Sequence, residues 1–248
     1  GGIAMPIGVL INVAAVVLGG ILGNFLGPRL SEDFKEKLTT VFGSCALLMG
    51  IISITFMKNL PAVVFAVIAG TIVGLGIRLG DRIIQGSRNL EKLISRVLPA
   101  SSGDSLIPRE EYESRLITII VLFCASGTGI YGSMVSGMAG DHSILIAKSI
   151  MDLPTATLFA CELGIIVSFI ALPQLVIFLF LFFLANALLP FCTPDMIGDF
   201  KACGGTLLLA TGFRMLQLKD FPIADMIPAM ALVMPLSALW TNVVVPML

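Results

Sequence analysis

The stretch Pro173-Gln-Leu-Val-Ile-Phe-Leu-Phe-Leu-Phe-Phe-Leu-Ala-Asn-Ala-Leu-Leu-Pro190 decides the fold class of this sequence. It carries no charged residue and has the length that a helix needs to cross a bilayer. Similar runs follow one another along the chain. Of its 248 residues, 57% are apolar and 12% are charged, and the mean hydropathy is +1.02. A soluble domain carries about 25% charged residues, so this composition excludes a water-soluble fold.

We therefore predict an all-α integral membrane protein with about eight transmembrane helices, because lipid offers unpaired backbone groups no hydrogen-bond partner. The expected spans are 6–27, 38–57, 60–79, 115–138, 153–172, 173–190, 202–218 and 222–246. A tight turn at Ala171-Leu-Pro-Gln174 is expected to separate the fifth span from the sixth. Met5 begins a sequence typical of a native start, so residues 1–4 are expected to be an appended segment.

Basic residues divide unevenly between the two sides of the membrane, which predicts the orientation. With the N-terminus outside, twelve of the fifteen fall in inner segments: Arg29, Lys35, Lys37, Arg78, Arg82, Arg88, Lys92, Arg96, Arg109, Arg115, Arg214 and Lys219. The outer loops hold only Lys58 and Lys201, and Lys148 lies within a membrane segment. We expect a multi-pass protein of the bacterial inner membrane with both termini outside.

The longest polar stretch, 80–114, is expected to lie in the cytoplasm. Its apolar residues recur at helical spacing, opposite Arg82, Arg88, Lys92 and Arg96. This pattern predicts a basic amphipathic helix along the inner leaflet, where anionic lipid attracts it. Pro99 and the Ser-Ser-Gly after it then form a connector. The helix would serve either as a regulatory or gating element or as an interfacial anchor that joins two halves.

The two ends of the chain resemble each other at a constant offset. Asn24-Phe-Leu-Gly-Pro28 matches Asn186-Ala-Leu-Leu-Pro190, and Lys58-Asn-Leu-Pro61 matches Lys219-Asp-Phe-Pro222 after one deletion. The other matched pairs are Asn12 with Gln174, Gly43 with Gly205, and Gly50 with Gly212. We interpret 5–79 and 173–248 as two inverted three-helix repeats that flank a central pair of spans in 115–172. Inverted repeats recur in secondary transporters, although gene duplication without transport would leave the same pattern.

The centre of the chain is expected to hold the chemistry. A glycine- and serine-rich stretch, 126–140, leads to Asp141 and then to a short apolar helix that carries Lys148. Asp152-Leu-Pro154 should break this helix, leaving a broken or re-entrant half-helix of the kind that forms midplane sites.

On a helix, Asp141, Lys148 and Asp152 would share one face, with Lys148 and Asp152 close enough to pair. Ionisable groups within membrane segments are costly and tend to face a cavity or a partner. The candidate site residues for a solute or ion are Asp141, Lys148, Asp152, Glu162, Asn12, Asn24, Gln174 and Asn186.

Structural roles fit the same residues. Asp141 and Asp152 could cap helices, Lys148 could be a counter-charge, and the amides could only join helices. His142 has the side chain of a pH sensor or of an ordinary interfacial residue. The five cysteines stand singly, so we expect no metal site and no cofactor.

Three segments resemble the bacterial inner-membrane family called domain of unknown function 554. They are Met5-Pro-Ile-Gly-Val-Leu-Ile-Asn-Val, Leu38-Thr-Thr-Val-Phe-Gly43 and Gly140-Asp-His-Ser-Ile-Leu-Ile-Ala-Lys-Ser-Ile-Met-Asp152. The resemblance covers nearly the whole chain from Met5. It implies a multi-span protein presumed to transport a solute. It gives weight to Asp141, Lys148 and Asp152, and less to Glu162, where a small residue is expected in the family.

A secondary transporter of a small ion or polar metabolite, working by alternating access with proton or ion coupling, is the leading hypothesis. An ion or solute channel and a non-transporting membrane scaffold are the alternatives. We do not expect an enzyme, because no catalytic triad or H-E-x-x-H motif occurs. The expected partners are the lipid bilayer and the solute, with no nucleic acid, and the many small residues would allow a homodimer.

Overall fold

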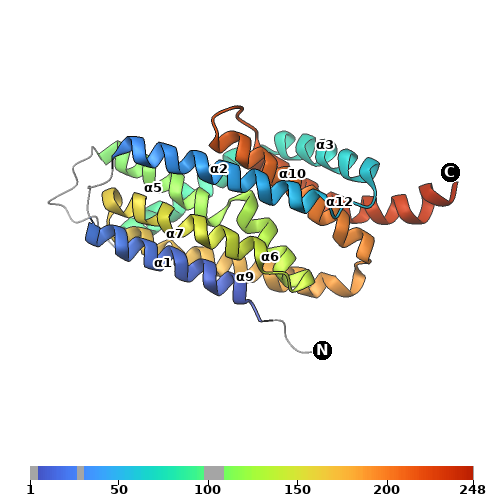
Figure 1. Cartoon of the computed structure of the whole chain (residues 1–248), viewed down its shortest axis with the longest axis horizontal. Coiled ribbons are helices and arrows are strands. Elements are labelled where there is room, and N and C mark those ends of the chain that lie inside the picture. The colour runs from blue at the N-terminus through green and yellow to red at the C-terminus, as the bar shows by residue number, and fades with distance from the viewer. Residues whose placement is uncertain (1–4, 27–30, 98–108, 248) are drawn as a thin grey trace.

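The computed structural model describes residues 5–26, 31–97 and 109–247, and their regular secondary structure is helical throughout (Figure 1). The longer helices are α1 (Ile7–Leu26), α2 (Glu32–Ile54), α3 (Leu60–Gly76), α4 (Leu79–Val97), α5 (Arg109–Cys124), α6 (Gly127–Ala139), α7 (Ser143–Leu163), α9 (Ala171–Leu188), α10 (Pro194–Met215) and α12 (Pro228–Leu239). The short ones are α8 (Ile166–Phe169), η1 (Leu189–Phe191), α11 (Ile223–Met226), η2 (Trp240–Val244) and η3 (Val245–Met247). The expected appended segment 1–4, Pro28, Arg29 and the connector 99–103 lie outside the described residues.

Within the described residues, six helical segments are long and apolar enough to cross a membrane. They are Ile7–Leu26, Asp33–Ile54, Glu110–Ala139, Ser143–Leu163, Ile166–Phe191 and Ile223–Met247. A seventh candidate joins α3 to α4 through a bend of 56°. The chain is thus a multi-pass helical membrane protein with six or seven candidate spans, compared with the eight expected. The expected span at 202–218 is not among them: it lies in α10, which also carries Asp199 and Lys201.

The central helix α7 runs unbroken from Ser143 to Leu163, with Pro154 inside it. The expected half-helix ending at Asp152 is therefore wrong. Proline removes one backbone donor, but membrane helices tolerate it where neighbouring groups satisfy the backbone. The hydroxyl of Thr155 donates to the carbonyl of Met151 at 2.7 Å, and that of Thr157 donates to Leu153 at 2.8 Å. Both hydroxyls follow Pro154 and bond carbonyls that precede it, so these two bonds cross the position of the proline.

The reversal after α7 comes earlier than the sequence suggested. Gly164 ends α7 with a φ of 75°, in the left-handed region that glycine adopts without strain. Ala171 is already the first residue of α9, so the expected turn at 171–174 is wrong. Pro173 lies in the first turn of α9, where its missing N–H leaves no intrahelical bond unmade.

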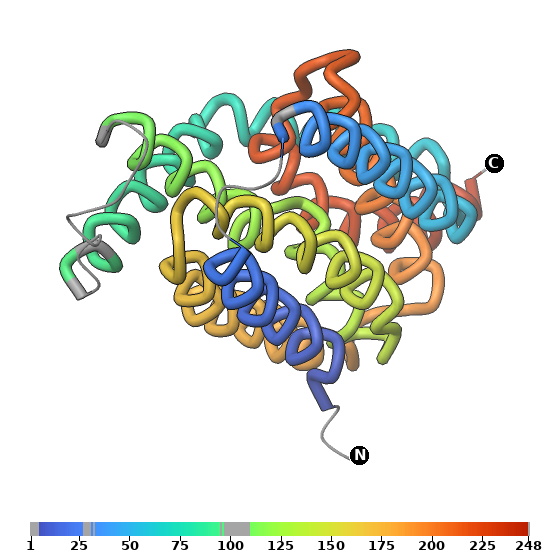
Figure 2. The backbone as a smooth tube through the Cα atoms, turned by 60° about the vertical axis from the view of Figure 1, so that its left-hand side comes forward, coloured from blue at the N-terminus to red at the C-terminus, as the bar shows by residue number. Residues whose placement is uncertain are grey.

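The helices form two bundles (Figures 1 and 2). In the first, α1 packs along α7, and α9 packs along α6, with α5 and α8 beside them. In the second, α2 packs along α10, and α3 packs along α12. Helix α6 also contacts α10, because its Tyr131 lies against Gly204. The first bundle therefore holds α7, which carries the main candidate residues, and α6 connects it to the second.

Close backbone contact holds α2 against α10. A Cβ atom at Gly50 would lie 2.8 Å from the carbonyl oxygen of Gly205, and one at Gly212 would lie 2.9 Å from that of Gly43. Small residues allow such an approach between membrane helices. Gly212 lies 162 positions after Gly50, and Gly205 lies 162 positions after Gly43. The two contacts are therefore equivalent under the offset that relates the two ends of the chain.

Helix α4 occupies the start of the polar stretch 80–114. Its Leu90 and Ile94 pack into the hydrophobic cluster around Leu116 of α5. Arg82, Arg88, Lys92 and Arg96 are all exposed on its other side. Protein thus covers Leu90 and Ile94, whereas Ile84 and Leu93 of the same helix are 43% and 57% exposed, so only part of the apolar face expected to meet the inner leaflet is covered.

Candidate functional site

A buried polar network joins three helices of the first bundle. The Nζ atom of Lys148 lies 2.9 and 2.7 Å from the two carboxylate oxygens of Asp152. Asn12 of α1 donates through Nδ2 to Oδ2 of Asp152 at 2.9 Å. Gln174 of α9 donates through Nε2 to Oδ1 of Asn12 at 2.7 Å. Four of the eight predicted site residues therefore form one continuous network, which we call the central network.

All four side chains of the central network are buried. Asn12 and Gln174 are 0% exposed, Lys148 is 3% exposed and Asp152 is 5% exposed. The Lys148 ammonium lies 5.8 Å from the ring centroid of Phe123. Burying an ion pair is unfavourable unless its remaining hydrogen-bonding capacity is satisfied, and Asn12 supplies one such bond to Asp152.

One acceptor of the central network is unpaired. The Oε1 atom of Gln174 is buried and is the one side-chain N or O atom of this kind without a hydrogen-bond partner in the described part of the chain. A buried unsatisfied acceptor raises the free energy of the folded state by about 1–3 kcal/mol. This oxygen is therefore a place where a hydrogen-bond donor or a cation would be stabilised.

Local sequence explains why these residues meet. Lys148 and Asp152 are four positions apart on α7, so they face each other across one turn. The glycines of α1 let it lie directly on α7: a Cβ at Gly19 would be 2.4 Å from the carbonyl oxygen of Leu153, and one at Gly23 would be 2.1 Å from that of Thr157. This contact brings Asn12 within reach of Asp152.

Asp141 does not belong to the central network. Gly140 ends α6 with a φ of 64°, and α7 begins at Ser143, so Asp141 precedes the helix. The expected stripe of Asp141, Lys148 and Asp152 on one helical face is therefore wrong. Asp141 instead accepts hydrogen bonds from Ser143 N at 3.1 Å and Ser143 Oγ at 2.6 Å, and its other oxygen binds Lys201 Nζ at 3.1 Å.

The surroundings of Asp141 stabilise its charged form. Partial burial alone would raise its pKa, but the bonds from Ser143 and Lys201 outweigh burial and hold the pKa below its ordinary value. Next to it, Nδ1 of His142 lies 2.7 Å from Oγ of Ser136. Lys201 also lies over the ring of Phe56, 4.4 Å from its centroid. This group ties the start of α7 to α10.

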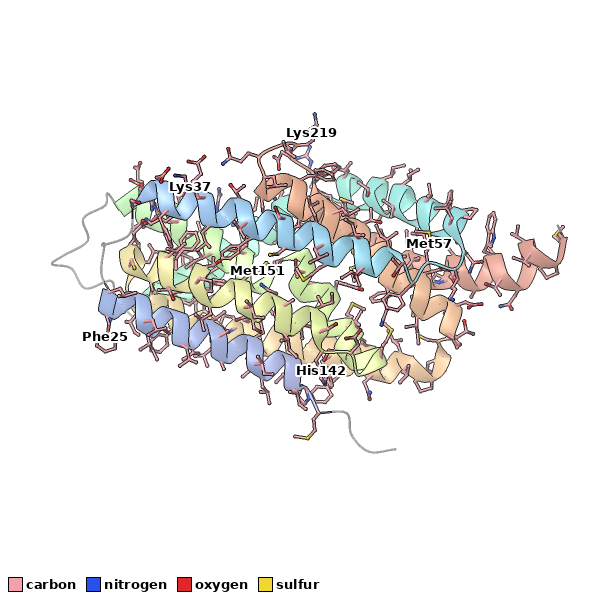
Figure 3. All side chains as sticks on the ribbon, viewed as in Figure 1. Phe25, Lys37, Met57, His142, Met151 and Lys219 are labelled. Atoms are coloured by element: carbon pink, nitrogen blue, oxygen red, sulfur yellow. The ribbon has the colours of Figure 1, made fainter. Side chains whose placement is uncertain are left out.

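Glu162 marks the other end of α7. One of its oxygens binds Lys35 of α2 and the other binds Nη1 of Arg115 of α5. Glu111 binds the same guanidinium through Nε at 3.1 Å and Nη2 at 2.7 Å. Phe25 and Lys37 mark this end of the molecule in Figure 3, and His142 and Met57 mark the opposite end.

A cavity of about 460 Å³ opens beside Glu162, between the two bundles. Its lining residues come from α2, α5, α7 and the end of α10: Lys35, Glu36, Thr39, Thr40, Arg115, Thr155, Leu158, Phe159, Glu162, Met215, Leu216 and Gln217. We call it the Glu162 cavity. Lys148, Thr155 and Glu162 recur at intervals of seven residues, so they lie along one side of α7. Thr155 is one turn from Asp152, so the cavity approaches the central network.

The two remaining predicted residues lie elsewhere. Asn24, near the end of α1, is exposed and is not part of the central network. Asn186, near the end of α9, donates through Nδ2 to the carbonyl oxygen of Gly137 at 3.2 Å. Its bond joins α9 to α6, as an interhelical amide does.

Asp199 of α10 was missed by the sequence analysis. It is fully buried and accepts bonds from Lys58 N at 2.7 Å, Asn59 N at 2.8 Å, Asn59 Nδ2 at 2.8 Å and Ser237 Oγ at 2.6 Å. These bonds join α10 to the turn before α3 and to Ser237 of α12, as a structural carboxylate does. The expected span began at 202, which left Asp199 in a loop. The position of this acidic residue, close to the start of the expected span, was the signal in the sequence that could have marked it.

Within the described residues, no group of three or more His, Cys, Asp or Glu side chains is placed to hold a metal ion.

The family model described as "Protein of unknown function (DUF554)" matches residues 7–238. "Uncharacterized protein YqgA" of Escherichia coli (strain K12) is 46% identical over 239 residues, covering 96% of this chain and 98% of the relative. "Uncharacterized membrane protein YdfK" of Bacillus subtilis (strain 168) is 24% identical over 226 residues, covering 90% and 92%. No solved structure matches significantly.

Proposed function

The chain belongs to the DUF554 family, described as proteins of unknown function, and we propose that it is a secondary transporter of a small ion or polar metabolite that works by alternating access. The observation that carries the proposal is the central network: a buried lysine–aspartate pair bonded by Asn12, which is in turn bonded by Gln174, 162 positions away. Ionisable residues inside a membrane protein typically mark a solute or proton pathway.

Ion pairs at both ends of α7 support alternating access. Glu162 binds Lys35 of α2 at one end, and Asp141 binds Lys201 of α10 at the other. Both pairs connect the first bundle to the second. Breaking one while the other holds would open the space between the bundles at one end only, which is what alternating access requires.

Pairings at the constant offset support inverted repeats. The Asn12–Gln174 bond joins two matched positions, so exchanging the repeats returns the same pair. The Gly43–Gly212 and Gly50–Gly205 contacts exchange with each other. Such contacts are expected where a pseudo-two-fold axis passes between α1 and α9 and between α2 and α10.

We propose that α10 crosses the membrane as an eighth span, surrounded mostly by protein. Half of its 22 residues are buried, including Asp199, whose bonds are all satisfied internally. Eight crossings return the C-terminus to the side of the N-terminus. The unequal distribution of basic residues supports placing both termini outside the cell and the Glu162 cavity on the cytoplasmic side.

A carrier is favoured over a channel, because a channel needs a continuous polar path, whereas the central network is 0–5% exposed. The test is charge displacement by purified protein in proteoliposomes on a solid-supported membrane, with pooled ions, amino acids and organic acids at two pH values. We expect a saturable current that disappears in Lys148→Met and persists in Lys37→Met, since Lys37 is exposed and pairs only with Asp33 in the described structure. Electroneutral exchange would instead appear as uptake of labelled solute.

If no pool produces current or uptake, the carrier proposal fails, and if thermal stabilisation is absent as well, the protein binds none of these solutes. A current that rises linearly with concentration and survives Lys148→Met would instead identify a channel.

A further inference from the structure

We infer that the Glu162 cavity is a binding site for a small organic carboxylate, with Lys35 and Arg115 as its cationic contacts. In the structure described here, the carboxylate of Glu162 occupies the position that the ligand carboxylate would take. The inference rests on the proposed function, since it names the class of solute that the carrier accepts.

The two cations are arranged around one carboxylate. Lys35 reaches Glu162 from α2 and Arg115 reaches it from α5, and each binds a different oxygen. Their side chains are 17% and 32% exposed, and that of Glu162 is 13% exposed. A planar group with two acceptor oxygens therefore already bridges these donors, and a ligand carboxylate offers the same two acceptors.

The rest of the cavity suits an acid with a short hydrocarbon body. Leu158, Phe159, Met215 and Leu216 supply apolar surface, and Thr39, Thr40 and Thr155 supply hydroxyl groups. Its volume of about 460 Å³ falls in the range of roughly 300–1,000 Å³ that is usual for small-molecule sites. The lining thus combines four apolar residues with eight polar or charged ones, Glu36 and Gln217 among them, which favours an organic anion with polar substituents over a fully hydrated inorganic ion.

The position of the site leads toward the central network. Along one side of α7, Thr155 lies about 10 Å from Glu162 and about 10 Å from Lys148, given a rise of 1.5 Å per residue. A carboxylate that left Lys35 and Arg115 would next meet the Lys148 ammonium. Glu162 thus has two roles: it competes with the ligand and it closes this end of the molecule when the site is empty.

The test is thermal unfolding of the full chain in detergent with increasing sodium succinate, with inorganic phosphate and choline chloride as comparison probes. Because a ligand that binds the folded state stabilises it, the wild type should show a weak, saturable stabilisation by succinate. Glu162→Gln should bind succinate at least tenfold more tightly, because it removes the carboxylate that competes with the ligand for Lys35 and Arg115. Lys35→Met and Arg115→Met should lose the effect, and the double variant Glu162→Gln/Arg115→Met should lose the gain.

Lys37→Met is the matched control, because this exposed lysine is two positions from Lys35 and does not line the cavity. It should bind succinate as the wild type does. If Glu162→Gln fails to fold, Glu111→Gln provides the second test: it frees one edge of Arg115 without touching the cavity lining, and it should also tighten binding.

Equal stabilisation of Glu162→Gln by phosphate and by succinate would overturn the carboxylate assignment. So would an equal loss of binding in Lys37→Met and Lys35→Met. If succinate binding fails while another solute gives Lys148-dependent flux, this inference falls and the carrier proposal stands. If succinate binds with the expected dependences but no pool gives flux, the binding-site inference is supported and the carrier proposal is contradicted.

Discussion

Asn12 and Asp152 are 140 positions apart in the sequence, and their side chains are joined at 2.9 Å in the interior of the protein. Asn12 also accepts the bond from Gln174, so it is the middle member of a three-helix chain of side chains. Its two bonds use the acceptor and one donor hydrogen of a single amide. The network consequently depends more on Asn12 than on Gln174.

This relationship predicts unequal effects of two similar substitutions. Asn12→Leu would remove one of the two bonds to Oδ2 of Asp152, which keeps its bond from Lys148, and would leave Nε2 of Gln174 without its acceptor. The free energy of unfolding should fall by about 2–4 kcal/mol, from one lost bond to a charged group and one unsatisfied donor. Gln174→Leu loses one bond but also removes the unpaired Oε1, so it should cost less than about 1.5 kcal/mol. Thermal unfolding in detergent of both variants checks the order, and an equal or reversed loss would contradict it.

The Lys148–Asp152 pair should be replaceable for stability but not for transport. Lys148→Met alone leaves a buried carboxylate without its counter-charge and should destabilise the fold by about 3–5 kcal/mol. The double variant Lys148→Met/Asp152→Asn keeps an acceptor for Asn12 and removes both charges, so most of that loss should be recovered. Unfolding temperatures and proteoliposome currents, measured on the same preparations, test both halves. Transport by the double variant would show that the pair has only a structural role.

Two glycine-to-alanine substitutions should change the stability of the protein in opposite directions. Gly50→Ala places a methyl group 2.8 Å from the backbone oxygen of Gly205, so α2 and α10 must separate and the yield of folded protein should fall sharply. Gly86→Ala in α4 meets nothing within 4 Å and should stabilise the protein by about 0.5–1 kcal/mol through helix propensity. Elution profile and unfolding temperature report on both, and the two variants serve as controls for each other.

Asp141 predicts a loss of stability in acid. Its pKa is lower in the folded state than the ordinary value of 3.8, so the unfolded chain binds the proton more readily. The stabilisation is complete above the unfolded pKa and is lost as the pH falls through the folded pKa. Asp141→Asn should therefore lower stability near neutral pH and reduce the decline between about pH 5 and pH 3. An unchanged acid-side slope in this variant would contradict the prediction.

The sequence predicted the membrane class and much of the central network, but not their geometry. Apolar runs identify spans because lipid imposes one requirement on every stretch of backbone, and this requirement also explains why the 173–190 run proved to be a helix. Lys148 and Asp152 were predicted to pair from their spacing of four, a purely local relation. Asn12 and Gln174 were connected only through the offset between the repeats.

What could not be predicted depended on contacts between distant segments. Pro154 was expected to break a helix because its local effect is unfavourable, yet α7 continues through it, packed closely against α1 and with threonine hydroxyls bonded across the proline. Asp141 was placed on the helix because Gly140 was not read as a helix end. Nothing local indicated that Lys35 and Arg115 would meet at Glu162, since the three residues belong to three helices.

Pro154 gives α7 an uneven stiffness. Because proline has no amide hydrogen, the carbonyl of Ile150 lacks its helical donor. One backbone hydrogen bond of the helix is therefore missing beside the Lys148–Asp152 pair. The segment before the proline carries this pair, and the segment after it carries Thr155 and Glu162. The helix is therefore easiest to bend between Asp152 and Glu162. Either segment can change its tilt while the other stays packed in the bundle.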